Sequence, residues 1–168
     1  MSQRLDWSRD GADWPNRELS RFVETPRLRW HVQIGGSGPA ILLLHGTGAS
    51  THSWGPLLPH LTSRFTVIAP DLPGHAFTSM PNSDGLTLAG MARETTALMH
   101  KLALEPRLIV GHSAGAAVAI KTALDRGLAP STIVSINGAL VPFGTTVSRF
   151  FSPLAKMIAS APLLTNFF

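Results

Sequence analysis

The sequence predicts an α/β fold, a mostly parallel β-sheet with flanking helices. Short apolar runs of strand length recur along the 168 residues, at 40–44, 66–69, 108–110 and 133–136. Such runs are typical of strands buried on both faces, as in parallel sheets. Segments with helical spacing lie between them, and strands that alternate with helices favour right-handed crossover connections. The length suits one domain with a sizeable core.

The first part of the chain predicts a lead-in followed by two short strands. Residues 1–20 are polar, with acidic and basic side chains interleaved, so we expect a solvated and self-compensating segment. Strands are expected at 21–24 and 28–34 because apolar residues alternate there. A Gly-rich turn at 35–39 then leads into the apolar run at 40–44.

Two helices are predicted in the second half. Apolar residues recur at helical spacing over 88–102, and Thr87 is a suitable N-cap. An Ala-rich helix is expected from Ser113 to Asp125, with Gly127 ending it. We therefore divide the chain into the lead-in at 1–20, the sheet and helices at 21–143, and an apolar, Phe-rich cap segment at 144–168.

Composition excludes several classes of protein and site. The chain has no Cys, so disulfides and thiolate chemistry are absent. A net charge of +4 from 14 basic and 10 acidic residues is mild and unclustered, and we expect no nucleic-acid partner. The seven His are scattered without an i, i+4 pair, and we expect no metal site and no cofactor. No apolar run of about 18 residues predicts a membrane span, and the N-terminus lacks a signal-peptide pattern.

The motif that carries chemistry is Gly111-His112-Ser113-Ala114-Gly115, a match to G-x-S-x-G. It follows an apolar strand and opens a predicted helix, which is the context that a nucleophilic serine requires. A tight turn projects the hydroxyl clear of the backbone, and flanking glycines leave room for it. The helix N-terminus presents free N–H groups to developing negative charge. Ser113 is therefore the candidate nucleophile.

A second motif, His45-Gly46-Thr47-Gly48, follows the run at 40–44. Its small residues allow the Thr47 N–H to point into the site, where it could form an oxyanion hole with the N–H of Ala114. We expect His45 to order this loop by hydrogen bonding. The glycines of both motifs and His112 are assigned loop-ordering or pocket-lining roles.

The loop after the strand at 66–69 contains Asp71 and His75. Asp71 invites assignment as the acid of a catalytic triad. We expect instead a structural corner in which Asp71 accepts hydrogen bonds from its own turn. His75 is expected to be structural or pocket-lining.

The order HGTG, DLPGH and GHSAG resembles the α/β-hydrolase superfamily over about residues 21–140. Three segments, 13–18, 28–33 and 45–54, further resemble the magnesium-chelatase accessory hydrolases of bacteriochlorophyll biosynthesis. One departure is Ala76, where a Gly often follows the His of DLPGH.

This resemblance implies the first six strands of an α/β-hydrolase and esterase-type chemistry. Ser113 would be the nucleophile, with Thr47 and Ala114 supplying the oxyanion hole. It implies an accessory role in magnesium chelation. The ligand would be small and apolar or tetrapyrrole-like, and magnesium-chelatase subunits would be partners. The location would be cytoplasmic or membrane-peripheral, with 144–168 as the membrane contact.

The superfamily places its acid and catalytic His after the sixth strand. This sequence has no Asp or Glu after Asp125 and no His after His112. We therefore expect a C-terminally truncated chain that is weakly active or inactive. Two alternatives stay open. The first is a non-catalytic protein that binds a tetrapyrrole or a chelatase subunit in the same pocket. The second is a membrane-surface module that uses 144–168.

Overall fold

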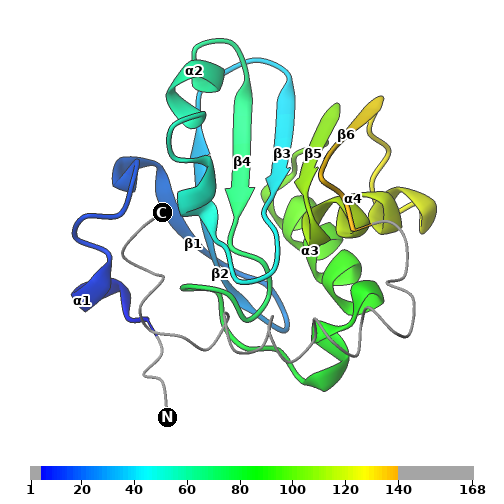
Figure 1. Cartoon of the computed structure of the whole chain (residues 1–168), viewed down its shortest axis with the longest axis horizontal. Coiled ribbons are helices and arrows are strands. Elements are labelled where there is room, and N and C mark those ends of the chain that lie inside the picture. Colours follow the sequence, from blue (N-terminus) through cyan, green and yellow to red (C-terminus); the bar gives the residue numbers. More distant parts are fainter. Residues whose placement is uncertain (1–4, 140–168) are drawn as a thin grey trace.

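A computed structural model describes residues 5–139, which form a six-stranded sheet in the order β1-β2-β4-β3-β5-β6 (Figure 1). The strands are β1 (Ser20–Glu24), β2 (Arg29–Gly35), β3 (Ala40–Leu44), β4 (Thr66–Pro70), β5 (Leu108–His112) and β6 (Thr132–Ile136). The α-helices are α1 (Trp7–Asp10), α2 (Leu58–Thr62), α3 (Leu88–Leu102) and α4 (Ala114–Leu124). Short 3₁₀ helices are η1 (Arg17–Leu19), η2 (Thr51–Trp54) and η3 (Ser83–Leu86).

The sheet is mostly parallel, as predicted. Strands β3, β4, β5 and β6 run parallel to one another, whereas β2 is antiparallel to both β1 and β4. The antiparallel start follows from short connections: β1 and β2 are joined by a tight turn, which cannot hold a parallel crossover. The parallel part brings the carboxyl ends of β3, β4 and β5 to one edge, where ligands bind in open α/β sheets.

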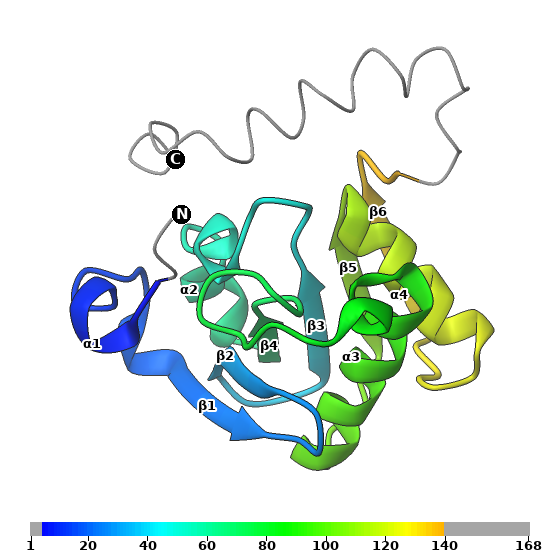
Figure 2. The same cartoon turned by 90° about the horizontal axis from the view of Figure 1, so that it is seen from below.

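Helices cover both faces of the sheet, because side chains alternate along each buried strand. Leu42 and Leu44 of β3 pack on one face with residues of α3 and α4, including Met99 and Val118. Ile41 and Leu43 pack on the other face, under Trp54 and Leu58 of η2 and α2. Figure 2 shows α2 on the side of the sheet opposite α3 and α4. The apolar run at 40–44 is thus buried on both faces, as expected.

The predicted helix at 88–102 is confirmed as α3, with the Thr87 hydroxyl accepting a hydrogen bond from the N–H of Gly90 at 3.0 Å. The end of the next helix differs from the prediction. α4 ends at Leu124, and Arg126, not Gly127, has the left-handed conformation, with φ of 56°. Gly127 is needed for space, since a Cβ there would lie 2.5 Å from the Thr96 hydroxyl oxygen.

The lead-in has exposed charged side chains such as Asp13 and Glu18, but it is not merely solvated. It runs alongside the β1 end of the sheet (Figure 1). The indole N–H of Trp14 donates to the Thr51 hydroxyl at 2.9 Å, and the Asn16 amide donates to the Gly55 carbonyl at 2.9 Å. The lead-in is therefore attached to the segment that follows β3.

The opposite edge of the sheet is apolar. Within residues 5–139, β6 is hydrogen-bonded to β5 alone. Val134 and Ile136 of β6 are 41% and 39% exposed.

In the described part of the chain, every helix is too short or too polar to span a bilayer. The predicted cap and membrane contact at 144–168 lie outside the described residues.

Candidate active site

Ser113 lies at the sharp turn between β5 and α4. Its φ of 51° and ψ of −116° are unusual for a residue with a side chain, and such backbone conformations cost about 1–3 kcal/mol. The surrounding backbone holds the turn: the Ser113 N–H donates to the Ile136 carbonyl at 2.9 Å, and its carbonyl accepts from the Ala139 N–H at 3.1 Å. The strained turn is the geometry expected of a nucleophile elbow.

The glycines on either side of the turn are required by close backbone approaches. A Cβ on Gly111 would lie 2.4 Å from the Ala116 Cα, and a Cβ on Gly115 would lie 2.2 Å from the Leu44 carbonyl oxygen. Both distances are far below van der Waals contact. The two glycines therefore let α4 start directly against β3 and β5.

The loop that starts at His45 lies beside this turn. A Cβ built on Gly46 would be 3.1 Å from the Ser113 Cβ and 3.2 Å from His112 Nδ1. The Ala49 N–H donates to the Gly46 carbonyl at 3.2 Å, and Gly48 has φ of 74°, as at the third position of a type II turn. The two sequence motifs thus meet at Gly46.

The two predicted oxyanion donors are both available. Within residues 5–139, neither the Thr47 N–H nor the Ala114 N–H has a hydrogen-bond acceptor. Ala114 is the first residue of α4, where N–H groups have no partner inside the helix and carry partial positive charge. Unpartnered donors next to a nucleophile are what an oxyanion hole needs.

His45 is buried and uses both ring nitrogens. Nδ1 donates to the Gly46 carbonyl at 2.7 Å, and Nε2 accepts from the Leu72 N–H at 2.8 Å. This arrangement requires a neutral ring protonated at Nδ1. Burial lowers the pKa of His45 to about 4. His45 therefore orders the loop, and no free lone pair is left for a base.

Asp71 joins three segments at this edge of the sheet. Its carboxylate accepts from the N–H groups of Thr51 at 2.7 Å and Phe77 at 3.2 Å, and from His31 Nδ1 at 2.7 Å. The Phe77 bond is the turn bond expected of a corner residue. The bonds to Thr51 and His31 were not predicted, because both partners come from distant parts of the sequence.

The remaining predicted residues lie around the same loops. The His75 ring is 5.1 Å from the His45 ring, and its Nδ1 donates to the Pro73 carbonyl at 3.1 Å. His112 is half-buried beside Gly46. Ala76 has φ of 39°, which explains physically why a Gly suits this position. Within residues 5–139, no imidazole or carboxylate is hydrogen-bonded to the Ser113 hydroxyl.

A family model described as alpha/beta hydrolase fold matches residues 39–163. The chain belongs to the alpha/beta hydrolase fold family. Among solved structures similar to this α/β-hydrolase is ALR0039 of Nostoc sp. PCC 7120, assigned as an alpha/beta hydrolase. It is 27% identical with a TM-score of 0.71, over 86% of this chain and 53% of that one.

Curated relatives of this α/β-hydrolase have diverse names. The magnesium-chelatase 30 kDa subunit of Rhodobacter capsulatus is 37% identical over 93% of the chain and 56% of its own length. Fluoroacetate dehalogenase of a Burkholderia species is 32% identical over 69% of the chain and 38% of its own length. The chain thus spans only about half, or less, of these relatives.

Sequence reasoning missed the supporting residues of this α/β-hydrolase site. Trp14, Thr51 and His31 are linked to the site loops by hydrogen bonds between segments far apart in sequence. The pair of Trp in the lead-in was the one signal available, because two large aromatic residues are costly to leave in water.

Proposed function

We propose that this chain carries the nucleophile and oxyanion hole of an esterase-type serine hydrolase with an accessory role in magnesium chelation for bacteriochlorophyll synthesis. The observation that carries the proposal is the strained backbone of Ser113, with φ of 51° and ψ of −116°. Strain of this size persists where function requires it, and the motif supplies the chemical reason.

The chemistry follows from the arrangement around Ser113. The hydroxyl oxygen adds to a substrate carbonyl, and negative charge develops on the carbonyl oxygen. The N–H groups of Thr47 and Ala114 are free to donate hydrogen bonds to that oxygen, and each such donor is worth about 3–4 kcal/mol in comparable sites. The proton acceptor is not among the residues hydrogen-bonded to Ser113 in 5–139. In the superfamily this acceptor is a His that follows the sixth strand, and residues 137–168 contain no His.

The accessory role is supported by the similarity to the magnesium-chelatase 30 kDa subunit, which extends over 93% of the chain. We propose a tetrapyrrole-like or small apolar ligand, with chelatase subunits as partners. The fluoroacetate dehalogenase and the 2-(acetamidomethylene)succinate hydrolase of Mesorhizobium japonicum share the fold with 32% and 36% identity, so the fold alone does not select the substrate.

A serine-directed phosphonate probe tests the nucleophile in the product of the complete reading frame. We expect one adduct on the peptide that contains Ser113, lost in Ser113→Ala. The matched control is Ser63→Ala, which removes an exposed serine and should label normally. If the peptide that contains position 113 still carried an adduct in the Ser113→Ala protein, Ser113 would not be the nucleophile.

A non-catalytic binding protein is the second candidate. It is favoured by the absence, within residues 5–139, of a base hydrogen-bonded to Ser113. This candidate predicts that a porphyrin quenches the Trp fluorescence equally in the parent and in Ser113→Ala, while the phosphonate labels neither. Labelling of Ser113 would exclude it.

A further inference from the structure

A second serine of this chain, Ser20, stands in a Ser-His-Asp arrangement that does not include Ser113. The Ser20 hydroxyl oxygen lies 3.0 Å from His31 Nε2, and His31 Nδ1 lies 2.7 Å from Asp71 Oδ2. A nucleophile within hydrogen-bond reach of a base, which a third group orients, is the signature of an activated serine. The sequence did not predict this arrangement, because the three residues come from β1, β2 and the loop after β4.

The hydrogen-bond partners fix which nitrogen of His31 carries the proton. Asp71 also accepts from the backbone N–H groups of Thr51 and Phe77, so its carboxylate acts as an acceptor. Nδ1 of His31 must therefore be the donor to Asp71. Nε2 is then unprotonated, and its lone pair accepts the hydrogen bond from the Ser20 hydroxyl. This is the tautomer that a general base requires.

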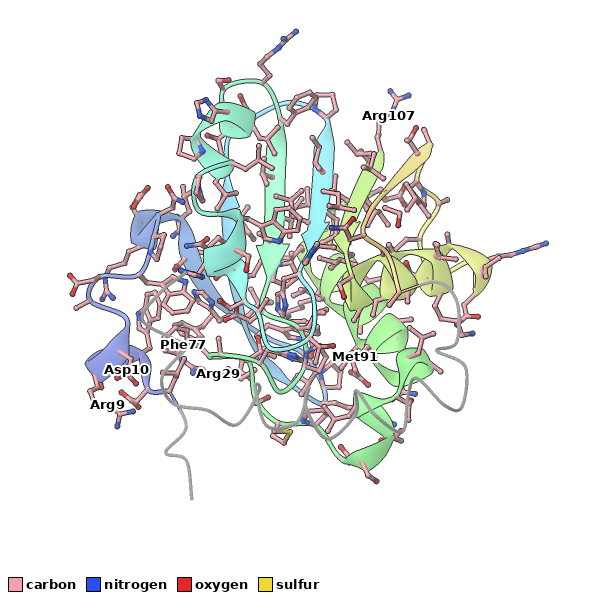
Figure 3. The ribbon with its side chains drawn as sticks, viewed as in Figure 1. Arg9, Asp10, Arg29, Phe77, Met91 and Arg107 are labelled. Carbon is pink, nitrogen blue, oxygen red and sulfur yellow. The ribbon has the colours of Figure 1, made fainter. Side chains whose placement is uncertain are left out.

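The surroundings of the His31 ring combine one carboxylate with several aromatic rings. His31 and Asp71 are both fully buried, and four aromatic rings contact the imidazole, with Trp14 the most distant at 6.2 Å. The centroids of Trp7, Phe77 and Phe22 lie 4.9, 5.3 and 5.4 Å from the His31 ring. Figure 3 shows Phe77 on the α1 side of the sheet. A proton taken up at Nε2 would leave the ring hydrogen-bonded to the Asp71 carboxylate.

An ester substrate has to reach only the Ser20 hydroxyl, because His31 and Asp71 act from within the protein. Ser20 begins β1, which within residues 5–139 is an edge strand hydrogen-bonded only to β2, and Ser20 is half-buried. Two N–H donors near the Ser20 hydroxyl are already engaged, however. The Ser20 N–H donates to the Arg17 carbonyl, and the Gln33 amide, 3.4 Å from the hydroxyl, also donates to the Pro15 and Asn16 carbonyls. With these two donors engaged, we limit the proposal to acyl transfer from activated esters, whose leaving groups depart readily.

We propose that Ser20 is an acyl-acceptor site for small activated esters, with His31 as its base and Asp71 as the residue that orients the base. The Ser20 oxygen forms a bond to the acyl carbon, and the bond from that carbon to the leaving group breaks. The hydroxyl proton passes to His31 Nε2 and then to the leaving alkoxide or phenolate. This step is independent of the proposed role of Ser113.

The test uses the 168-residue chain with Ser113→Ala and p-nitrophenyl acetate as the acyl donor. Cleavage after Glu18 and Glu24 releases residues 19–24, in which Ser20 is the one hydroxyl side chain. Mass spectrometry then follows acetylation of Ser20 against that of Ser63, an exposed serine that donates to the His60 carbonyl. We expect Ser20 to react faster by on the order of 10² or more, as general-base catalysis provides.

His31→Asn isolates the base. The Asn amide N–H can still donate toward Asp71, whereas no ring nitrogen faces Ser20. We expect acetylation of Ser20 to fall to the rate of Ser63 while near-ultraviolet circular dichroism reports the folded chain. Acetylation of Ser20 no faster than that of Ser63 in the Ser113→Ala chain would overturn the proposal, whether or not His31→Asn folds. A folded His31→Asn chain that reacts as fast as its parent would overturn it too.

Discussion

The strain at Ser113 predicts that replacing this serine by glycine stabilises the protein. A φ of 51° with ψ of −116° is close to the second position of a type II′ turn, where Gly is the preferred residue. Removing the Cβ should recover about 1–3 kcal/mol of backbone strain. Gly also gives the unfolded chain more freedom, which costs about 0.4–1 kcal/mol. The Ser113 hydroxyl has no hydrogen-bond partner within residues 5–139, so little else is lost.

The matched control is Ser113→Ala, which deletes the hydroxyl but keeps the Cβ and the strain. Urea denaturation of both variants compares their unfolding free energies, and we expect Ser113→Gly to exceed Ser113→Ala by about 1 kcal/mol. For a chain of this size, that difference raises Tm by about 2–4 °C. A Ser113→Gly protein that is less stable than Ser113→Ala would refute the claim that the elbow is strained.

Four further measurements check other parts of the structure. Ala103 ends α3 with φ of 52° and ψ of 40°, so Ala103→Gly should raise the unfolding free energy by about 0.5–1 kcal/mol in urea denaturation; an unchanged value would contradict this. Asp71→Asn should lower that free energy by about 3 kcal/mol, because buried N–H groups lose a charged acceptor; a loss under about 1 kcal/mol would show that the loops hold without it. Burial lowers the pKa of His45 from 6.5 to about 4, so the stability it contributes is complete above pH 6.5 and falls by about 3 kcal/mol as pH drops to 4. His45→Gln should flatten that slope, and an equally steep loss would assign it to other groups. Val134→Lys places a charge on the apolar edge strand β6 and should reduce association in size-exclusion chromatography with light scattering; a parent chain that runs as a sharp monomer would remove the premise.

Local sequence patterns predicted the sheet because the apolar residues of a strand indicate which of its faces are buried. The run at 40–44 is apolar at every position, and β3 is buried on both faces. Thr87 could be identified as a cap because capping depends on neighbours within one turn of helix. The end of α4 was harder, because Gly127 is required by the approach of Thr96 from another helix, which no local pattern reveals.

The site was predictable where chemistry and backbone strain lie in one short motif. The GHSAG motif predicted a tight turn at Ser113 followed by the start of a helix, and the structure has this strained turn directly before α4. The role of Asp71 was predicted only in part, because two of its three hydrogen bonds come from segments 20 and 40 residues away. His31 looked like one more residue of an alternating strand. Its contact with Ser20 depends on strand register, which the sequence alone does not specify.

The hydrogen bond from Trp14 to Thr51 makes the lead-in part of the site's scaffold. Thr51 is held on one side by Asp71 and on the other by an indole that precedes the whole sheet in sequence. A chain begun at Ser20 would keep all six strands and the serine elbow. It would lose the hydrogen bond that the Trp14 indole donates to Thr51, in the segment that follows Thr47. Variation or cleavage in these opening residues can therefore change the segment around Thr51 without altering Ser113, Thr47 or Ala114.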